Sequence, residues 1–159
     1  MNLSFYLKSL PYLFSRDLIP DHSIEDISDS GLEKVLKEQE IKAVVLDVDQ
    51  SLCYFHGEEI HERVRDVFDG LYETYGENLY ILSNCDAERL DELQNEVFPY
   101  SEYPNLRIIN PRDTRKPLSE VYKELNDALE YKRINPSEVL MIGDRLWTDI
   151  AGANRQGYV

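Results

Sequence analysis

The chain has 159 residues, which is enough for one globular domain with a core of its own. Its 31 acidic residues outnumber the 17 basic ones, and the net charge of −14 argues against a nucleic-acid-binding surface, which needs clustered lysine and arginine. The two cysteines lack the spacing of a zinc site, and no apolar run reaches the roughly 20 residues of a transmembrane helix.

The chain opens with an apolar segment in which Lys8 is the only charge among residues 1–14, and Pro11 divides that segment into two short pieces. A free tail would leave too much apolar surface in water. We therefore expect residues 1–40 to form an N-terminal segment and lead-in that packs on or beside a core of residues 41–159. Peripheral contact of residues 1–16 with a membrane is a second expected role.

After this opening, strand-like and helix-like hydrophobic periods alternate along the chain. Strands are expected at IKAVVLDV (41–48), NLYILSN (78–84), NLRIIN (105–110) and EVLMIGD (138–144), and helices at 60–75, at 90–97, after Pro117 and at 149–155. This order predicts an α/β fold, a Rossmann-like three-layer sandwich with a mostly parallel sheet. Ligands of such sheets bind outside the carboxyl ends of the strands.

Polar residues stand where these expected strands end. They are Asp47 and Asp49 after the first strand, Ser83 and Asn84 after the second, Lys116 in the loop after the third, and Asp144 after the fourth. Each signal is weak alone, because an acidic chain places aspartates together by chance and a loop lysine is usually a solvated charge. Their joint placement predicts one functional rim.

The residue types on this rim suit phosphoryl transfer through an aspartyl-phosphate intermediate. One carboxylate would attack phosphorus, and a divalent ion held by neighbouring carboxylates would offset the repulsion between two anions. Hard oxygen ligands favour Mg²⁺. A second carboxyl group would protonate the leaving oxygen, while Lys116 and the Ser83 hydroxyl would hold the phosphate oxygens.

The motifs DVDQSL, LSN, KP and GDRLWTD resemble the four motifs of the haloacid dehalogenase (HAD) superfamily of phosphatases. The resemblance implies Asp47 as the nucleophile and Asp49 as the general acid/base. It implies phosphate binding by Ser83, Asn84 and Lys116, and a Mg²⁺ site formed by Asp47, Asp49 through its backbone carbonyl, and Asp144, with Asp149 as a ligand or beside the ligands.

The stretches GDRLWTDIAGANRQG, SNCDAERL and IPDHSIEDI resemble the YqeG-type group, which includes the mitochondrial phosphatidylglycerophosphate phosphatases. This implies a substrate that is membrane-borne or similarly large. It also implies a location in the cytoplasm or on the inner membrane face, which is the matrix side in a eukaryote. Gln50 and Ser51 stand where the relatives usually carry Asn and Thr. The family continues into a further strand after Val159, so a sheet without that edge strand is expected.

Spacing bears on the substrate as well, because 34 positions separate Asp49 from Ser83 and 33 separate Ser83 from Lys116. One helix and its flanking segments fill each interval, so a capless HAD enzyme is expected. The resemblance then implies an open pocket for a large phosphate ester. An oligomeric enzyme for a small soluble phosphate, with a lid from a partner subunit, is the alternative.

A calcium-binding module is a further alternative, since Asp47, Asp49, Ser51 and Glu58 take positions one, three, five and twelve of an EF-hand-like loop. Against it, Leu52 occupies the sixth position, where the sharp turn needs glycine, and a strand precedes the loop where an EF-hand needs a helix. A catalytically inert interaction module is the last alternative. The phosphatase interpretation is favoured because each of its roles has a residue to fill it.

Overall fold

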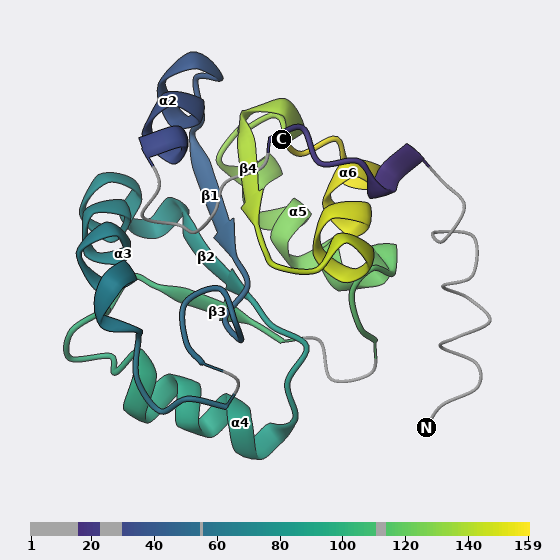
Figure 1. Ribbon diagram of the computed structural model, residues 1–159. Helices are drawn as coiled ribbons and strands as arrows, with labels where there is room; N and C mark the ends of the chain where they lie inside the picture. Colours follow the sequence, from purple (N-terminus) through teal and green to yellow (C-terminus); the bar gives the residue numbers. More distant parts are fainter. Residues whose placement is uncertain (1–15, 23–29, 55, 111–113) are drawn as a thin grey trace.

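A computed structural model describes residues 16–22, 30–54, 56–110 and 114–159, and Figure 1 shows their path. Within these residues one sheet contains the strands β1 (Ala43–Leu46), β2 (Leu79–Leu82), β3 (Arg107–Ile109) and β4 (Val139–Ile142). The strands are parallel and lie in the order β3-β2-β1-β4. The expected α/β fold with a parallel sheet is therefore confirmed.

Helical elements connect these strands. The α-helices are α2 (Ser30–Glu38), α3 (Glu62–Tyr75), α4 (Ala87–Glu92), α5 (Lys123–Tyr131) and α6 (Ala151–Gln156). Shorter turns are η2 (Arg16–Leu18), η3 (Gly76–Asn78), η5 (Ser119–Tyr122) and η6 (Pro136–Glu138), and two π-helical turns are η4 (Leu93–Val97) and η7 (Leu146–Ile150). Strand and helix alternate as the hydrophobic periods predict. The π-helical turn η4 lies in a segment that the same periods predict as plain helix. The turn η7 begins before the predicted helix 149–155 and shares only its last two residues with it.

The first strand, Ala43–Leu46, is shorter than the expected range 41–48, although backbone hydrogen bonds continue past both of its ends. Lys42 N–H still donates to the Glu138 carbonyl at 2.8 Å, and Asp47 N–H donates to the Ile142 carbonyl at 2.9 Å. Pairing thus reaches one residue beyond Ala43 and Leu46. The second of these bonds holds the backbone of Asp47 at the carboxyl end of the sheet.

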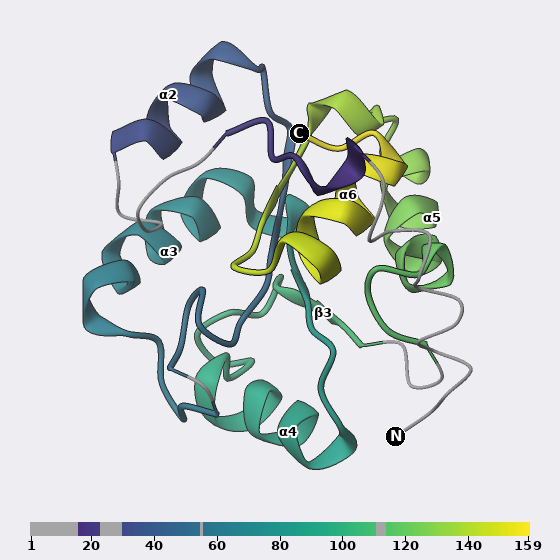
Figure 2. The ribbon, with the colours of Figure 1, turned by 45° about the vertical axis from the view of Figure 1, so that its right-hand side comes forward.

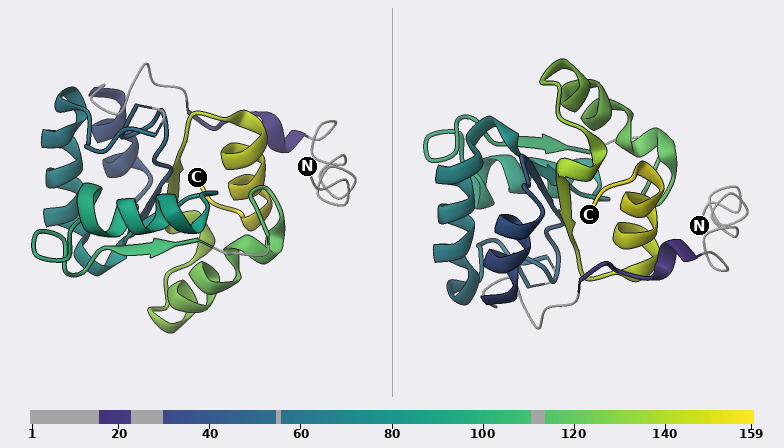
Figure 3. Two further views of the ribbon diagram at one scale, coloured as in Figure 1. Left: turned by 90° about the horizontal axis from the view of Figure 1, so that it is seen from below. Right: turned by 90° about the horizontal axis from the view of Figure 1, so that it is seen from above.

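The sheet separates two apolar cores, as expected for parallel strands that are covered on both faces. Val44 and Leu46 of β1 face the side of α2 and α3, where Phe68 is completely buried. Ala43 and Val45 face the other side, where α5 and α6 pack. Figures 2 and 3 show these helices on opposite sides of the sheet. Burial of a side chain such as Phe68 contributes about 1.5–3 kcal/mol of stability.

Part of the lead-in packs on α6. The Asn154 side-chain amide donates to the carbonyls of Asp17 and Ile19, each at 2.9 Å, and Arg155 Nε lies 2.6 Å from Asp17 Oδ2. Leu18 packs beside Leu118 and Ala151. The apolar opening, residues 1–15, lies outside the described residues.

Val159 pairs with the edge of β4 that faces away from β1. Val159 N–H donates to the Val139 carbonyl, and the Val159 carbonyl accepts from Met141 N–H, both at 2.9 Å. Val159 thus pairs with β4 as a strand residue would. Across the described segments, no helix has both the length and the apolar composition that crossing a bilayer requires.

Candidate active site

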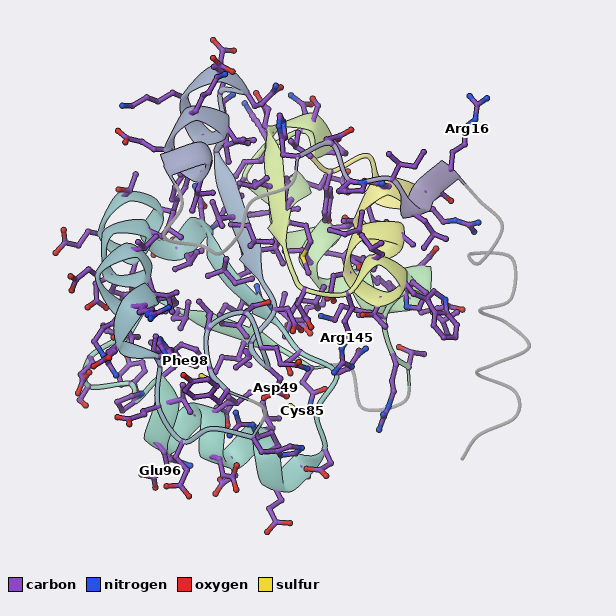
Figure 4. The ribbon with its side chains drawn as sticks, viewed as in Figure 1. Arg16, Asp49, Cys85, Glu96, Phe98 and Arg145 are labelled. Atoms are coloured by element: carbon purple, nitrogen blue, oxygen red, sulfur yellow. The ribbon has the colours of Figure 1, made fainter. Side chains whose placement is uncertain are left out.

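A cavity of about 280 Å³ lies at the carboxyl ends of the strands. Its lining includes six residues that the sequence predicts for the site: Asp47, Asp49, Ser83, Asn84, Lys116 and Asp149. Figure 4 shows Asp49, Cys85 and Arg145 at this end of the sheet. Residues that are far apart in the sequence therefore meet at one edge, as the parallel topology requires.

Lys116 is the central cation of this cavity and is 1% exposed. Its Nζ lies 2.5 Å from Asp47 Oδ1 and 2.6 Å from Asp149 Oδ1. Burial by itself would lower the pKa of Lys116, but the charges of Asp149 and Asp47 outweigh burial and raise it. The ammonium therefore stays charged and joins the two carboxylates.

Asp47 experiences opposing influences. Burial raises the pKa of its carboxyl group to about 6, the Lys116 charge opposes that rise, and the Asp149 charge adds to it. The Asp47 carboxylate is thus ionised at neutral pH and held in place by a charged hydrogen bond. An ionised and oriented carboxylate is the form that can act as a nucleophile.

A group of three carboxylates provides a candidate cation site. Oxygen atoms of Asp47, Asp144 and Asp149 all lie within 4.8 Å of one another. Asp149 is buried and Asp144 is exposed. Burial and the nearby Asp149 charge raise the pKa of Asp144, which indicates that these negative charges are incompletely compensated. The three carboxylates offer the hard oxygen ligands that Mg²⁺ prefers.

Gly143 allows Asp149 to lie against the end of β4. A Cβ atom at position 143 would come within 2.5 Å of Asp149 Cβ and 2.7 Å of Asp149 Oδ2. The Asp149 carboxylate also accepts a hydrogen bond from Arg145 N–H at 3.1 Å. The short loop between β4 and η7 therefore sets the position of this buried carboxylate.

Ser83 and Asn84 follow β2 as expected. Ser83 is 3% exposed, and its N–H donates to the Ile109 carbonyl at 3.2 Å. The Asn84 side chain accepts from Lys116 N–H at 2.8 Å and donates to the Lys116 carbonyl at 3.4 Å. Asn84 thus fixes the backbone from which the Lys116 side chain extends.

The Asp49 side chain lies in the same cavity, but its contacts differ from those of the three-carboxylate group. Asp49 Oδ1 accepts from an Arg89 guanidinium nitrogen at 3.2 Å and from His56 N–H at 3.3 Å. The Arg89 guanidinium also donates to the Gly57 carbonyl at 2.9 Å and to Glu92 at 3.0 Å. Arg89 therefore links Asp49 to the loop after β1 and to α4.

The segment around Asp47 and Asp49 does not have the shape of an EF-hand. The residues directly before it form β1, where an EF-hand has a helix. The side chains of Asp47 and Asp49 contact different cations, Lys116 and Arg89. The residues with the spacing of a calcium loop thus lie in the loop that follows a strand.

Several cavity residues escape a reading of the motifs alone: His56, Cys85, Asp86, Arg89, Arg115, Arg145 and Thr148. The burial of Arg89 could have been predicted from the sequence. Arg89 lies four residues before Leu93 and so shares the inward face of the helical turn. A basic residue on a buried helix face needs a carboxylate partner, and Asp49 and Glu92 supply it.

Comparisons with known proteins agree with this geometry. A family model described as mitochondrial PGP phosphatase matches residues 11–159. Probable phosphatase YqeG of Bacillus subtilis is 27% identical over 146 residues, which cover 92% of this chain and 77% of that protein. The mitochondrial phosphatidylglycerophosphatase GEP4 of Saccharomyces cerevisiae is 29% identical over 164 residues, which cover 99% of this chain and 84% of that protein.

A crystal structure of an uncharacterized protein from Listeria monocytogenes has the same fold, with a TM-score of 0.50 and 17% identity over 74% of this chain and 75% of that one. At this identity the likeness supports the fold alone. The family match spans nearly the whole chain, including every strand that ends at the cavity. The chain therefore belongs to the mitochondrial PGP phosphatase family, whose members are HAD-type phosphatases.

Proposed function

We propose that this phosphatase is a magnesium-dependent phosphomonoester hydrolase that acts through an aspartyl-phosphate on Asp47. The observation that carries the proposal is the buried Lys116 ammonium, which joins Asp47 to Asp149 beside a third carboxylate, Asp144. A phosphate group entering the cavity would meet a nucleophile and a cation side by side. This arrangement stabilises the added negative charge of a phosphoryl-transfer transition state.

Asp47, Asp144 and Asp149 are the residues that would hold the Mg²⁺ ion, with the backbone carbonyl of Asp49 as a further ligand. The donor set fits such an ion, because three close carboxylates share one lysine and carry more negative charge than it balances. When bound, the ion supplies positive charge that offsets the repulsion between the attacking carboxylate and the phosphate.

The first half of the reaction forms a bond between an Asp47 carboxylate oxygen and phosphorus, and it breaks the bond from phosphorus to the ester oxygen. Asp49 in its acid form gives a proton to the departing oxygen. The Ser83 hydroxyl and Lys116 bind the phosphate oxygens. Arg89 fixes the side of the cavity on which the Asp49 carboxyl group lies.

The second half restores the enzyme. Asp49 takes a proton from a water molecule, the water oxygen bonds to phosphorus, and the bond between phosphorus and Asp47 breaks. Inorganic phosphate and the free Asp47 carboxylate are the products. Asp49 ends this half with the proton that it needs for the next turnover.

The substrate in this proposal is phosphatidylglycerophosphate or a similar membrane-borne phosphate ester. The supporting facts are the family match and the yeast relative, which is named a phosphatidylglycerophosphatase. Within the described residues a single helical segment follows β1 and another follows β2, so no cap domain covers the cavity there. The enzyme would work at the inner membrane face, on the matrix side in a eukaryote, with residues 1–16 as the peripheral contact.

An assay of purified protein tests the proposal. Phosphate release is measured with Mg²⁺ against phosphatidylglycerophosphate in mixed micelles, soluble sugar phosphates and nucleotide monophosphates. Preferred hydrolysis of the lipid supports the whole proposal, while preferred hydrolysis of a sugar phosphate by an oligomer supports the soluble alternative. No phosphate release from any of these substrates would contradict the proposed function.

A further inference from the structure

Two arginines on the rim of the active-site cavity have no part in the proposed chemistry. Arg115 directly precedes Lys116 and Arg145 directly follows Asp144, and both arginines are exposed at the cavity. In the described segments Arg115 forms no ion pair. Arg145 has one long contact, in which its Nε lies 3.8 Å from Asp144 Oδ2. Figure 4 shows Arg145 at the end of the sheet where Asp49 lies.

The backbone beside each arginine is fixed by the site itself. Asn84 accepts a hydrogen bond from Lys116 N–H at 2.8 Å, next to Arg115. Arg145 N–H donates to Asp149 Oδ2 at 3.1 Å. Both guanidinium groups therefore extend from ordered backbone beside the scissile-phosphate site.

The charge of the cavity lining differs from that of the whole chain. The chain has 31 acidic and 17 basic residues, whereas the lining has four of each. Each lining carboxylate already has a partner in the protein: Lys116 for Asp47 and Asp149, the Arg89 guanidinium for Asp49, and the Arg89 N–H for Asp86. Arg115 and Arg145 take no part in these pairings.

Two exposed arginines that do not pair with the carboxylates of the lining are available to an anionic ligand. The phosphate to be hydrolysed has Lys116 and Ser83 as its proposed partners, so it does not require the two rim arginines. The planar guanidinium group binds phosphate oxygens in pairs, which suits a second phosphate better than a single point charge would. Both arginines are exposed at the cavity, whereas Lys116 and Ser83 are buried in it.

We propose that Arg115 and Arg145 form a second anion subsite, which binds a phosphate group of the substrate other than the one that is hydrolysed. This inference rests on the proposed function. Phosphatidylglycerophosphate carries both a terminal phosphomonoester and an internal phosphodiester, whereas a simple alkyl phosphate carries only the former. The subsite selects the first kind of substrate over the second.

Two soluble substrates, in each of which the leaving oxygen belongs to a glycerol unit, isolate the subsite from membrane effects. Deacylated phosphatidylglycerophosphate has the internal phosphodiester, and glycerol phosphate lacks it. In both, the bond that breaks joins the scissile phosphorus to an oxygen of a glycerol unit. The measured quantity is the ratio of kcat/KM for the first substrate to kcat/KM for the second. The variants are Arg115→Gln, Arg145→Gln and the double variant.

Each single substitution should lower this ratio by about tenfold, which corresponds to one charge-assisted hydrogen bond. Arg133→Gln is the control, because Arg133 is exposed in the turn that leads to the amino end of β4, away from the cavity. The control should leave the ratio unchanged. A ratio that stays the same in Arg115→Gln, Arg145→Gln and the double variant would overturn the subsite.

Binding without turnover separates this inference from the proposed function. Calorimetry of the Asp47→Asn variant with Mg²⁺ should show tighter binding of the deacylated lipid than of glycerol phosphate, and the rim substitutions should remove the difference. If the unaltered protein hydrolyses neither substrate, the proposed function fails, and the calorimetric difference still decides the subsite. Equal binding of the two ligands would contradict the subsite even if both were hydrolysed.

Discussion

Lys116 determines what the carboxylates around it can do. Its ammonium holds Asp47 in one orientation and balances much of the charge of the buried Asp149. Asp144 lies near the same carboxylates but is exposed, and among the described residues its ion-pair contact is the long one to Arg145, at 3.8 Å. The proposed nucleophile, its positioning cation and the proposed metal ligands thus come from the segments that follow three strands, β1, β3 and β4.

Replacing the nucleophile should separate catalysis from folding. Asp47→Asn should lower phosphate release at least about a thousandfold, because an amide is a far poorer nucleophile than a carboxylate. Asp127→Asn, in an exposed position of α5, is the matched control and should retain full activity. The measurement is phosphate release, with circular dichroism as a check on folding. Turnover near the normal rate in Asp47→Asn would contradict the aspartyl-phosphate mechanism.

Removal of the buried cation should affect both stability and activity. Lys116→Met leaves Asp47 and Asp149 without their common partner, which should cost about 3 kcal/mol in the free energy of unfolding at neutral pH. Lys123→Met, on the exposed surface of α5, should cost little and should leave activity intact. Denaturant titrations and phosphate-release assays measure the two effects, and equal effects of the two substitutions would contradict the role of Lys116.

The stability defect of Lys116→Met should also depend on pH. Without the ammonium, which opposes the rise, the folded-state pKa of Asp47 moves further above its unfolded value. Such a group binds more protons in the folded state, so its contribution to stability is retained at low pH and lost as the pH rises through the folded-state pKa. The defect should therefore shrink as the pH falls from neutral to about 5. A defect that grows on acidification would contradict this explanation.

Substitution of two glycines by alanine should have opposite effects, because Gly143 lies in a crowded loop of the site and Gly70 lies on an open helix surface. Gly143→Ala places a Cβ atom 2.5 Å from Asp149 Cβ, so Asp149 must move; this should cost about 1–3 kcal/mol and most of the activity. Gly70 lies exposed within α3 with no atom within 4 Å of an added Cβ. Gly70→Ala should therefore raise stability by about 1 kcal/mol.

Thermal denaturation and phosphate release measure both glycine variants. The two substitutions are chemically identical, so the intrinsic effect of the added methyl group is matched between them. If Gly143→Ala kept full activity, the close approach of Asp149 to β4 would be unnecessary for catalysis.

The sequence predicted elements and motif positions better than contacts between side chains. Buried runs such as Ala43–Leu46 are recognisable because strands covered on both faces are continuously apolar, and parallel order then brings their carboxyl ends together. The pairing of Arg89 with Asp49 was not predictable, because it joins residues 40 positions apart through a helix whose rotation the hydrophobic period fixes only roughly. The position of Asp144 and Asp149 relative to Asp47 likewise depends on the π-helical turn η7.

For the whole molecule, the choice of cation distinguishes the enzyme from a calcium-binding module. Activity should require Mg²⁺, and Ca²⁺ should inhibit it, because calcium has longer bonds and a looser coordination geometry that would misplace the phosphate relative to Asp47. The test is turnover of chelated protein to which each ion is added back. Turnover stimulated by Ca²⁺, or tight Ca²⁺ binding without catalysis, would favour the calcium-binding alternative.

Deletion of residues 1–16 tests the proposed membrane contact. The intact chain should bind liposomes weakly and without strong dependence on salt, since a protein with a net charge of −14 gains no electrostatic attraction to anionic lipid. The deletion should abolish this binding and preserve hydrolysis of soluble phosphates. Flotation assays measure the binding. Unfolding of the shortened chain, or liposome binding that persists, would instead place the segment in the core.

The packing of η2 on α6 bears on how the rate of the enzyme would depend on substrate in a membrane. Asp17 is tied to Arg155, and η2 also lies against η7, the turn that carries Asp149. Arg16, where the proposed membrane segment ends, therefore belongs to the same packed unit as Asp149. An enzyme held to a bilayer by that segment would search in two dimensions, and its rate would follow the mole fraction of substrate in the membrane and not the bulk concentration. Diluting the substrate with neutral lipid at constant total substrate should then slow turnover.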